Sequence, residues 1–140
     1  MRHDLVGASD TTYTIKAGLL PVEVKYLLDP LVKHYADFSG RANRKQFWLY
    51  ALWLCVVYIV IGILSAALGE KAGNAVIVLV WLALIVPNLA MIVRRLHDTD
   101  RSGWWVLISF LPLIGGLILF VFEVLPGTPG ENRFGSQPQN

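Results

Sequence analysis

The segment from Phe47 to Leu68 contains no charged residue along its whole length. An α-helix rises about 1.5 Å per residue, so about 20 residues cross the roughly 30 Å hydrocarbon core of a bilayer. A surface helix of a soluble protein carries a polar face, which this segment lacks. The segment therefore predicts a transmembrane helix. The composition agrees, because only 16% of the 140 residues are charged and 55% are hydrophobic, whereas soluble domains carry roughly 25% charged residues.

Two further apolar runs follow, at residues 75–93 and 104–125. The first is just long enough to span, and its Pro87 should kink the helix. The second contains Pro112 and Gly115-Gly116 near its middle, which leaves two interpretations: one kinked spanning helix, or two short half-helices in a re-entrant hairpin. We favour the single helix, because each half is too short to cross a bilayer. We therefore expect an all-α membrane protein with three transmembrane helices, the third kinked at Pro112 or re-entrant.

The apolar runs divide the chain into three regions. Residues 1–36 are polar and then amphipathic, and the apolar stripe between Leu19 and Tyr35 is too short to span, so we expect it to lie on the membrane surface. Residues 37–126 form the transmembrane domain, with spans at about 47–68, 75–93 and 104–125. Residues 127–140 are rich in Pro and Gly, a composition that stops helices and does not build a core. We expect a C-terminal tail there.

The distribution of Lys and Arg predicts the orientation. Six cations lie on one side of the expected spans, and two, Lys71 and Arg133, lie on the other. Cytoplasmic loops carry the excess of positive charge, so we expect the N-terminus and the loop 94–105 in the cytoplasm. The C-terminus is then outside if the third run spans, and cytoplasmic if it is a hairpin. In the spanning arrangement Glu123 lies near the far end of the third helix, where Lys71 is a candidate partner.

The loop 94–105 concentrates the polar side chains of the second half of the chain. Its acids and histidine are near neighbours beside arginines, which repel a metal cation, so we expect no metal site. A structural clasp explains them better: Asp98 and Asp100 can pair with Arg94 and Arg95 or reach Arg41 and Arg44, and Ser102 can cap the third helix. The expected clasp consists of His97, Asp98, Asp100 and Ser102.

Several classes of function are excluded or disfavoured. A net charge of +2 without a long basic patch argues against nucleic acid, and one cysteine, Cys55, excludes an internal disulfide. No nucleophile beside a base and no phosphate-binding loop is present, so we expect neither an enzyme nor a cofactor. The intramembrane polar residues Asn88 and Glu123 suggest a small transporter or channel component as an alternative. Three helices are too few for a monomeric pore, so this alternative needs an oligomer.

The remaining hypothesis is binding at the cytoplasmic membrane interface. Each basic residue near an anionic leaflet contributes about 1 kcal/mol of attraction, and tryptophans favour the headgroup level. We therefore expect a non-enzymatic module that binds anionic lipid, a membrane-protein partner or a second copy through a basic and aromatic rim. The expected contact residues are Arg41, Arg44, Lys45, Arg94, Arg95, Arg101, Trp104 and Trp105.

Separated motifs in a fixed order resemble the domain-of-unknown-function family 805, whose members are small bacterial inner-membrane proteins. These motifs are Tyr35–Arg41, Phe47-Trp48, Arg94–Asp98, Ser102–Trp105, Pro112–Gly115 and Pro126–Gly135. The resemblance covers roughly residues 33 to 138. It implies a multi-pass protein of the bacterial inner membrane and implies no established activity.

Overall fold

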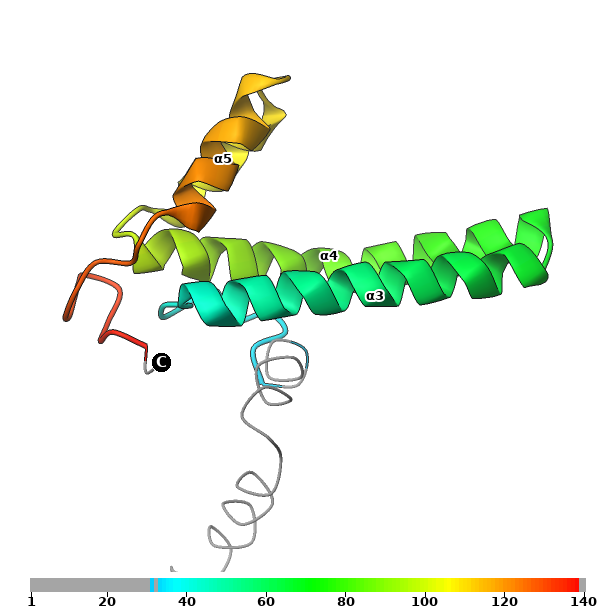
Figure 1. The fold of residues 1–140 in the computed structure, drawn as a ribbon, viewed down its shortest axis with the longest axis horizontal. Helices are drawn as coiled ribbons and strands as arrows, with labels where there is room; N and C mark the ends of the chain where they lie inside the picture. Colours follow the sequence, from blue (N-terminus) through cyan, green and yellow to red (C-terminus); the bar gives the residue numbers. More distant parts are fainter. Residues whose placement is uncertain (1–30, 32, 139–140) are drawn as a thin grey trace, which may run out of the picture.

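The computed structural model describes residue 31 and residues 33–138. Its elements are all helical: α3 (Arg44–Ala67), α4 (Glu70–Asp98), the 3₁₀ helix η1 (Gly103–Phe110) and α5 (Ile114–Val124). Figure 1 shows α3 and α4 as a long antiparallel pair, with a shorter hairpin of η1 and α5 that points away from it. The expected amphipathic segment lies almost entirely outside the described residues.

Local sequence explains where the long helices begin and end. Asn43 caps α3, because its side chain accepts a hydrogen bond from the Gln46 amide while the Gln46 side chain accepts one from the Asn43 amide. This reciprocal pair satisfies two amides that a helix start otherwise leaves without partners. The turn between the helices passes through Gly69 at a φ of 80°, and α4 begins with Glu70, whose charge complements the helix dipole.

Both long helices have the length and composition of membrane spans. Only 11% of the apolar stretch of α3 and 22% of that of α4 is buried inside the molecule. A core helix of a soluble protein would be mostly buried, so the exposed apolar surface favours a membrane environment for both helices. α3 begins before the expected span 47–68, and α4 extends beyond the expected span 75–93 at both ends, continuing through Pro87 to Asp98.

The third apolar run differs from the interpretation that we favoured. It is not one kinked helix: η1 ends at Phe110, the chain turns through residues 111–113, and α5 runs back beside η1. The residue before a proline avoids helical geometry, and Leu111 is extended at φ −77° and ψ 112°. Leu113 then adopts a left-handed φ of 67°. A β-carbon at Gly115 would lie 1.7 Å from the Ile108 carbonyl oxygen, so glycine there permits the closure.

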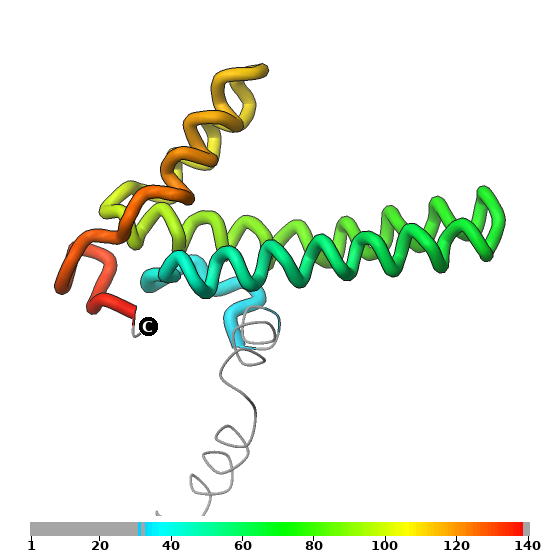
Figure 2. The backbone as a smooth tube through the Cα atoms, viewed as in Figure 1, coloured from blue at the N-terminus to red at the C-terminus, as the bar shows by residue number. Residues whose placement is uncertain are grey.

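Because the hairpin reverses, the C-terminal tail returns to the end of the α3–α4 pair from which the hairpin starts. Figure 2 shows residues 126–138 beside the start of α3 and the end of α4. We call this the basic end: residues 40–45, 94–102, 122–125 and 126–138. The opposite end is the α3–α4 turn at Leu68 and Gly69.

Candidate functional site at the basic end

Three charged side chains from distant parts of the chain meet at the centre of the basic end. Nε of Arg41 donates to Oδ1 of Asp98 at 3.0 Å, and Nη1 of Arg95 lies 2.5 Å from Oδ2 of the same carboxylate. The side chains of Arg41, Asp98 and Arg95 are 1%, 4% and 0% exposed. We call these three residues the Asp98 cluster. Removing a charge from such a buried group is costly, because its partners lose their compensation.

The tail supplies further acceptors to Arg41. Its guanidinium donates to the carbonyl of Gly130 at 2.6 Å, of Thr128 at 2.6 Å and of Gly135 at 3.3 Å. These carbonyls are available because the Pro- and Gly-rich tail forms turns rather than a regular ladder. The tail therefore completes the solvation of a buried cation, a role that its turn-rich composition did not suggest.

Arg95 is surrounded in the same manner by the end of α5. Its Nε donates to the Glu123 carbonyl at 3.0 Å, and its guanidinium also bonds the Leu125 carbonyl. Glu123 thus lies at the basic end, whereas Lys71 stands at the opposite end of α4. The expected Glu123–Lys71 pair is wrong, because it assumed that the third run crosses to the Lys71 side.

Hydrogen bonds and one ring contact hold the tail against the last turn of α4. The Thr128 amide donates to the Asp98 carbonyl at 2.8 Å, and Nδ2 of Asn132 donates to the His97 carbonyl at 2.9 Å. The His97 ring stacks on Phe134 at 3.9 Å between ring centroids, and its Nδ1 donates to the Gly40 carbonyl at 3.1 Å. No three His, Cys, Asp or Glu side chains gather as a metal site within the described residues. His97 serves packing here.

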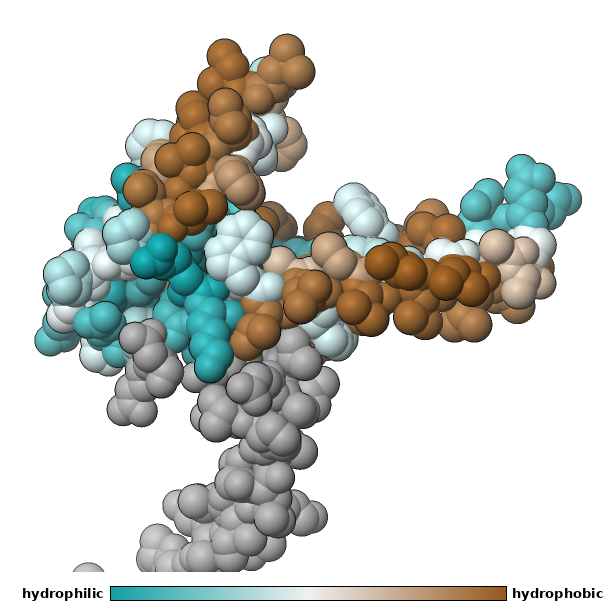
Figure 3. Space-filling model, in the orientation of Figure 1, coloured by the Kyte–Doolittle hydropathy of each residue, from teal (hydrophilic) through white to brown (hydrophobic). Residues whose placement is uncertain are grey.

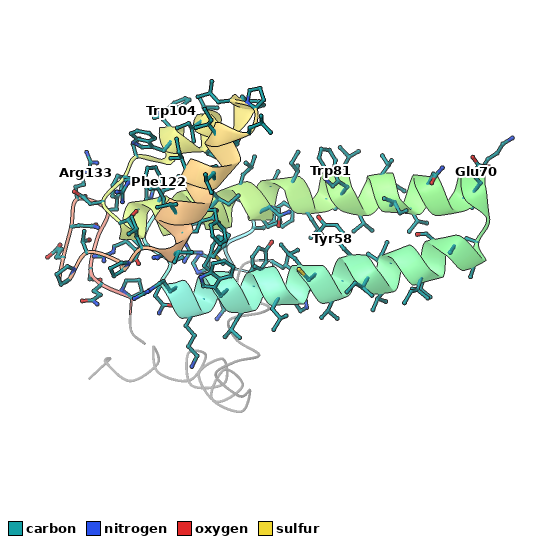
Figure 4. The ribbon with its side chains drawn as sticks, turned by 45° about the horizontal axis from the view of Figure 1, so that its top comes forward. Tyr58, Glu70, Trp81, Trp104, Phe122 and Arg133 are labelled. Carbon is teal, nitrogen blue, oxygen red and sulfur yellow. The ribbon has the colours of Figure 1, made fainter. Side chains whose placement is uncertain are left out.

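The remaining loop residues are more exposed. Asp100 pairs with Arg133 at 3.1 Å, with both side chains in solvent, so Arg133 belongs to the basic end and not to the opposite side as expected. Ser102 caps η1 by accepting from the Trp104 amide at 3.4 Å. The Arg101 guanidinium lies 4.1 Å from the centre of the Phe122 ring. Figure 4 shows Phe122 and Arg133 near the basic end and Trp104 on the hairpin.

Asn88, the amide that we expected inside the membrane, has a hydrogen-bond partner. The Tyr50 hydroxyl donates to Oδ1 of Asn88 at 2.7 Å and joins α3 to α4. Glu123 contributes to a groove of about 200 Å³ beside this bond, together with Phe47 and Met91. The arrangement accounts for Asn88 as a link between helices, since an amide in lipid needs a hydrogen-bond partner.

Burial separates the expected contact residues into two groups. Arg41 and Arg95 are enclosed and cannot reach a membrane surface. Arg44 and Lys45 are exposed at the start of α3, and Trp104 and Trp105 are 78% and 45% exposed on η1. Arg94 and Arg101 are partly exposed.

A cleft of about 380 Å³ opens at the start of α3. Arg44 and Lys45 line one side and Pro126, Gly127 and Gln137 line the other, with Asp98 at its wall. A helix N-terminus and two cations favour an anion at this place. The cleft therefore has the charge to receive a phosphate group.

Comparison with known families agrees with the resemblance found in the sequence. A family model described as "Protein of unknown function (DUF805)" matches residues 35–136. The chain belongs to the DUF805 family. The matched region includes α3, α4, both limbs of the hairpin and most of the tail, so these elements form one family unit.

The relatives of this DUF805 chain include inner membrane proteins. It is 45% identical over 112 residues to inner membrane protein YhaH of Escherichia coli strain K12, covering 78% of this chain and 93% of that protein. It is 44% identical over 109 residues to inner membrane protein YhaI of the same strain, covering 78% and 92%. No solved structure matches the chain. The expected family is confirmed, and the relatives support an inner-membrane location.

Proposed function

We propose that this chain is a non-enzymatic inner-membrane module that crosses the bilayer with α3 and α4 and binds anionic lipid headgroups at its cytoplasmic basic end. The observation that carries the proposal is the exposed pair Arg44 and Lys45, which lines a cleft where α3 enters the membrane. Asp98 also lines this cleft, and its negative charge is compensated there by Arg41 and Arg95.

The charge distribution supports the cytoplasmic orientation. Of the eight Lys and Arg residues between residues 40 and 138, all but Lys71 lie at the basic end. Figure 4 shows the two ends, with Arg133 at one and Glu70 at the other. Because the hairpin returns Arg133 to this end, the asymmetry is seven to one, compared with the six to two expected from three spans. Cations concentrate on the cytoplasmic side of inner-membrane proteins.

Aromatic side chains beside the cations fit the headgroup level. Trp48 is 41% exposed one turn after Arg44, and its ring makes an edge contact with Phe120 of α5 at 6.0 Å. Trp104 and Trp105 lie at the start of η1, beside the basic end. Indole rings favour the interface between headgroups and acyl chains, so cations and tryptophans together mark one depth in the membrane.

Replacing Arg44 and Lys45 together with glutamine should weaken the preference for anionic lipid. Two cations at about 1 kcal/mol each correspond to roughly a thirtyfold loss at low salt. The measurement is the ratio of phosphatidylglycerol to phosphatidylethanolamine that co-purifies with the protein, by mass spectrometry. Lys71→Gln at the opposite end is the matched control and should leave the ratio unchanged. An unchanged ratio in the double variant of the folded protein would remove the headgroup proposal.

Topology can be measured separately with single cysteines in a Cys55→Ala background. A cysteine at Ser136, in the tail, should react with a membrane-impermeant maleimide only after the inner membrane is permeabilised. A cysteine at Asn74, at the start of α4, should react in intact spheroplasts. Both residues are exposed, so access depends on the side of the membrane and not on burial. Labelling of both positions from the same side would contradict two spans.

A further inference from the structure

We propose that the hairpin of η1 and α5 enters the cytoplasmic leaflet and returns without crossing, so that its tip lies among the acyl chains of that leaflet. We call residues 110–113 the hairpin tip. The inference goes beyond headgroup binding and does not depend on it. It rests on the part of the proposed function that has α3 and α4 spanning with the basic end in the cytoplasm.

The hairpin tip is apolar and uncovered. Phe110, Leu111 and Leu113 are 81%, 56% and 96% exposed. The other turn of the molecule is different, because Glu70 and Lys71 follow directly after Gly69. Figure 3 shows this contrast: the end of α3 and α4 farthest from the basic end is hydrophilic, while the end of the η1–α5 hairpin is hydrophobic. A turn that faces water needs polar side chains. We therefore infer that the α3–α4 turn faces water and the hairpin tip faces lipid.

The length of each limb fits one leaflet and not a bilayer. The 8 residues of η1 rise roughly 16 Å at the 3₁₀ spacing of about 2.0 Å. The 11 residues of α5 rise about 16 Å at the α-helical spacing. Both values are about half of the roughly 30 Å hydrocarbon core. The limbs also lean away from α3 and α4 (Figure 1), which reduces the depth that they reach when those helices span.

Hydrogen bonds within the turn prepare its backbone for lipid. The Leu111 amide donates to the Ile108 carbonyl at 2.9 Å, and the Gly115 amide donates to the Leu111 carbonyl at 3.0 Å. The Ile114 amide donates to the Pro112 carbonyl at 2.8 Å, and proline itself has no amide hydrogen. These bonds give three amides of the turn a partner within it, which lowers the cost of placing this backbone beside acyl chains.

Polar contacts hold the base of the hairpin at the basic end. Arg95 donates to the Glu123 carbonyl, and Nη1 of Arg44 donates to the Val124 carbonyl at 3.3 Å. The guanidinium of Arg101, which precedes η1, lies over the Phe122 ring of α5 and so joins the two limbs at their base. The base is therefore fixed beside the cations, at headgroup level, and the limbs extend from it into the apolar layer.

The test uses Leu113→Cys in the Cys55→Ala background, because a side chain that is 96% exposed can be replaced without disturbing packing. We expect no reaction with an impermeant maleimide from either face of the inner membrane. After reconstitution in phosphatidylcholine liposomes, a fluorophore at this cysteine should be quenched by lipids with a nitroxide on the acyl chain, and more strongly than one at Ser136.

Each other outcome overturns the inference. Labelling of Leu113→Cys from the outside would mean that the run crosses, and labelling from the cytoplasm would mean that the hairpin stays in water. Phe110→Cys, at a second exposed tip position, guards against a folding defect of one variant. The liposomes carry no anionic lipid, so failure of the headgroup proposal leaves this result unchanged. Failure of the two-span topology appears separately, at Asn74→Cys.

Discussion

Asp98→Asn is expected to lower the free energy of unfolding by about 3–5 kcal/mol, the range for removing one partner of a buried ion pair. The substitution keeps the shape of the side chain and removes its charge. Arg41 and Arg95 then remain buried side by side with carbonyl oxygens but no anion. The measurement is unfolding of the purified protein in detergent micelles, followed by circular dichroism as the fraction of a denaturing detergent is raised.

Asp100→Asn is the matched control for this prediction. Asp100 lies two residues away and also pairs with an arginine, but its side chain is 45% exposed and that of Arg133 is 62% exposed. Exposed pairs contribute about 0–1 kcal/mol, and asparagine tolerates the left-handed φ of 56° at this position. Equal losses for the two variants would show that burial of the Asp98 cluster does not set its contribution.

Gly115→Ala is expected to destabilise the η1–α5 hairpin by about 1–3 kcal/mol or more, the range for overpacking a closely fitted contact. The new methyl group would lie 1.7 Å from the Ile108 carbonyl oxygen and 3.1 Å from the Ser109 α-carbon. These are backbone atoms, so the limbs must separate to admit it. The same unfolding measurement in micelles reports the loss.

The neighbouring glycine provides an identical substitution without the clash. A β-carbon at Gly116 meets nothing within 4 Å, and alanine is a better helix former than glycine by up to about 1 kcal/mol. Gly116→Ala should therefore be neutral or stabilising. Two alanine variants that behave alike would mean that the limbs do not meet at Gly115, which would contradict the hairpin.

Local chemistry explains which parts of the fold the sequence could predict. A long run without charged residues can be recognised from its own residues alone. The composition and length of the two runs therefore predict α3 and α4. Pro112 and Gly115-Gly116 marked the break in the third run correctly. They did not decide between a kink and a reversal, because the reversal depends on Gly115 meeting Ile108 across the turn. That contact is a property of two limbs and not of either one.

The basic end was predictable only in part for a related reason. Cations and acids on one side of the membrane suggested that Asp98 could reach Arg41, and the structure brings them together. The other acceptors around Arg41 are carbonyls of Thr128, Gly130 and Gly135. Every residue carries a carbonyl, so the sequence does not show which backbone carbonyls will accept a hydrogen bond from Arg41. The misplacement of Glu123 and Arg133 followed directly from counting the third run as a span.

The binding of Arg41 by the tail imposes an order on biosynthesis. Arg41 precedes the first span, yet its acceptor at Gly130 lies 89 residues later in the chain. While the chain is being made, α3 and α4 can enter the membrane on their own hydrophobicity, but this arginine stays hydrated until the tail has emerged. The basic end is thus expected to be the last part of the fold to form. A protein truncated before Thr128 would still insert, but it would lack the tail carbonyls that accept hydrogen bonds from Arg41.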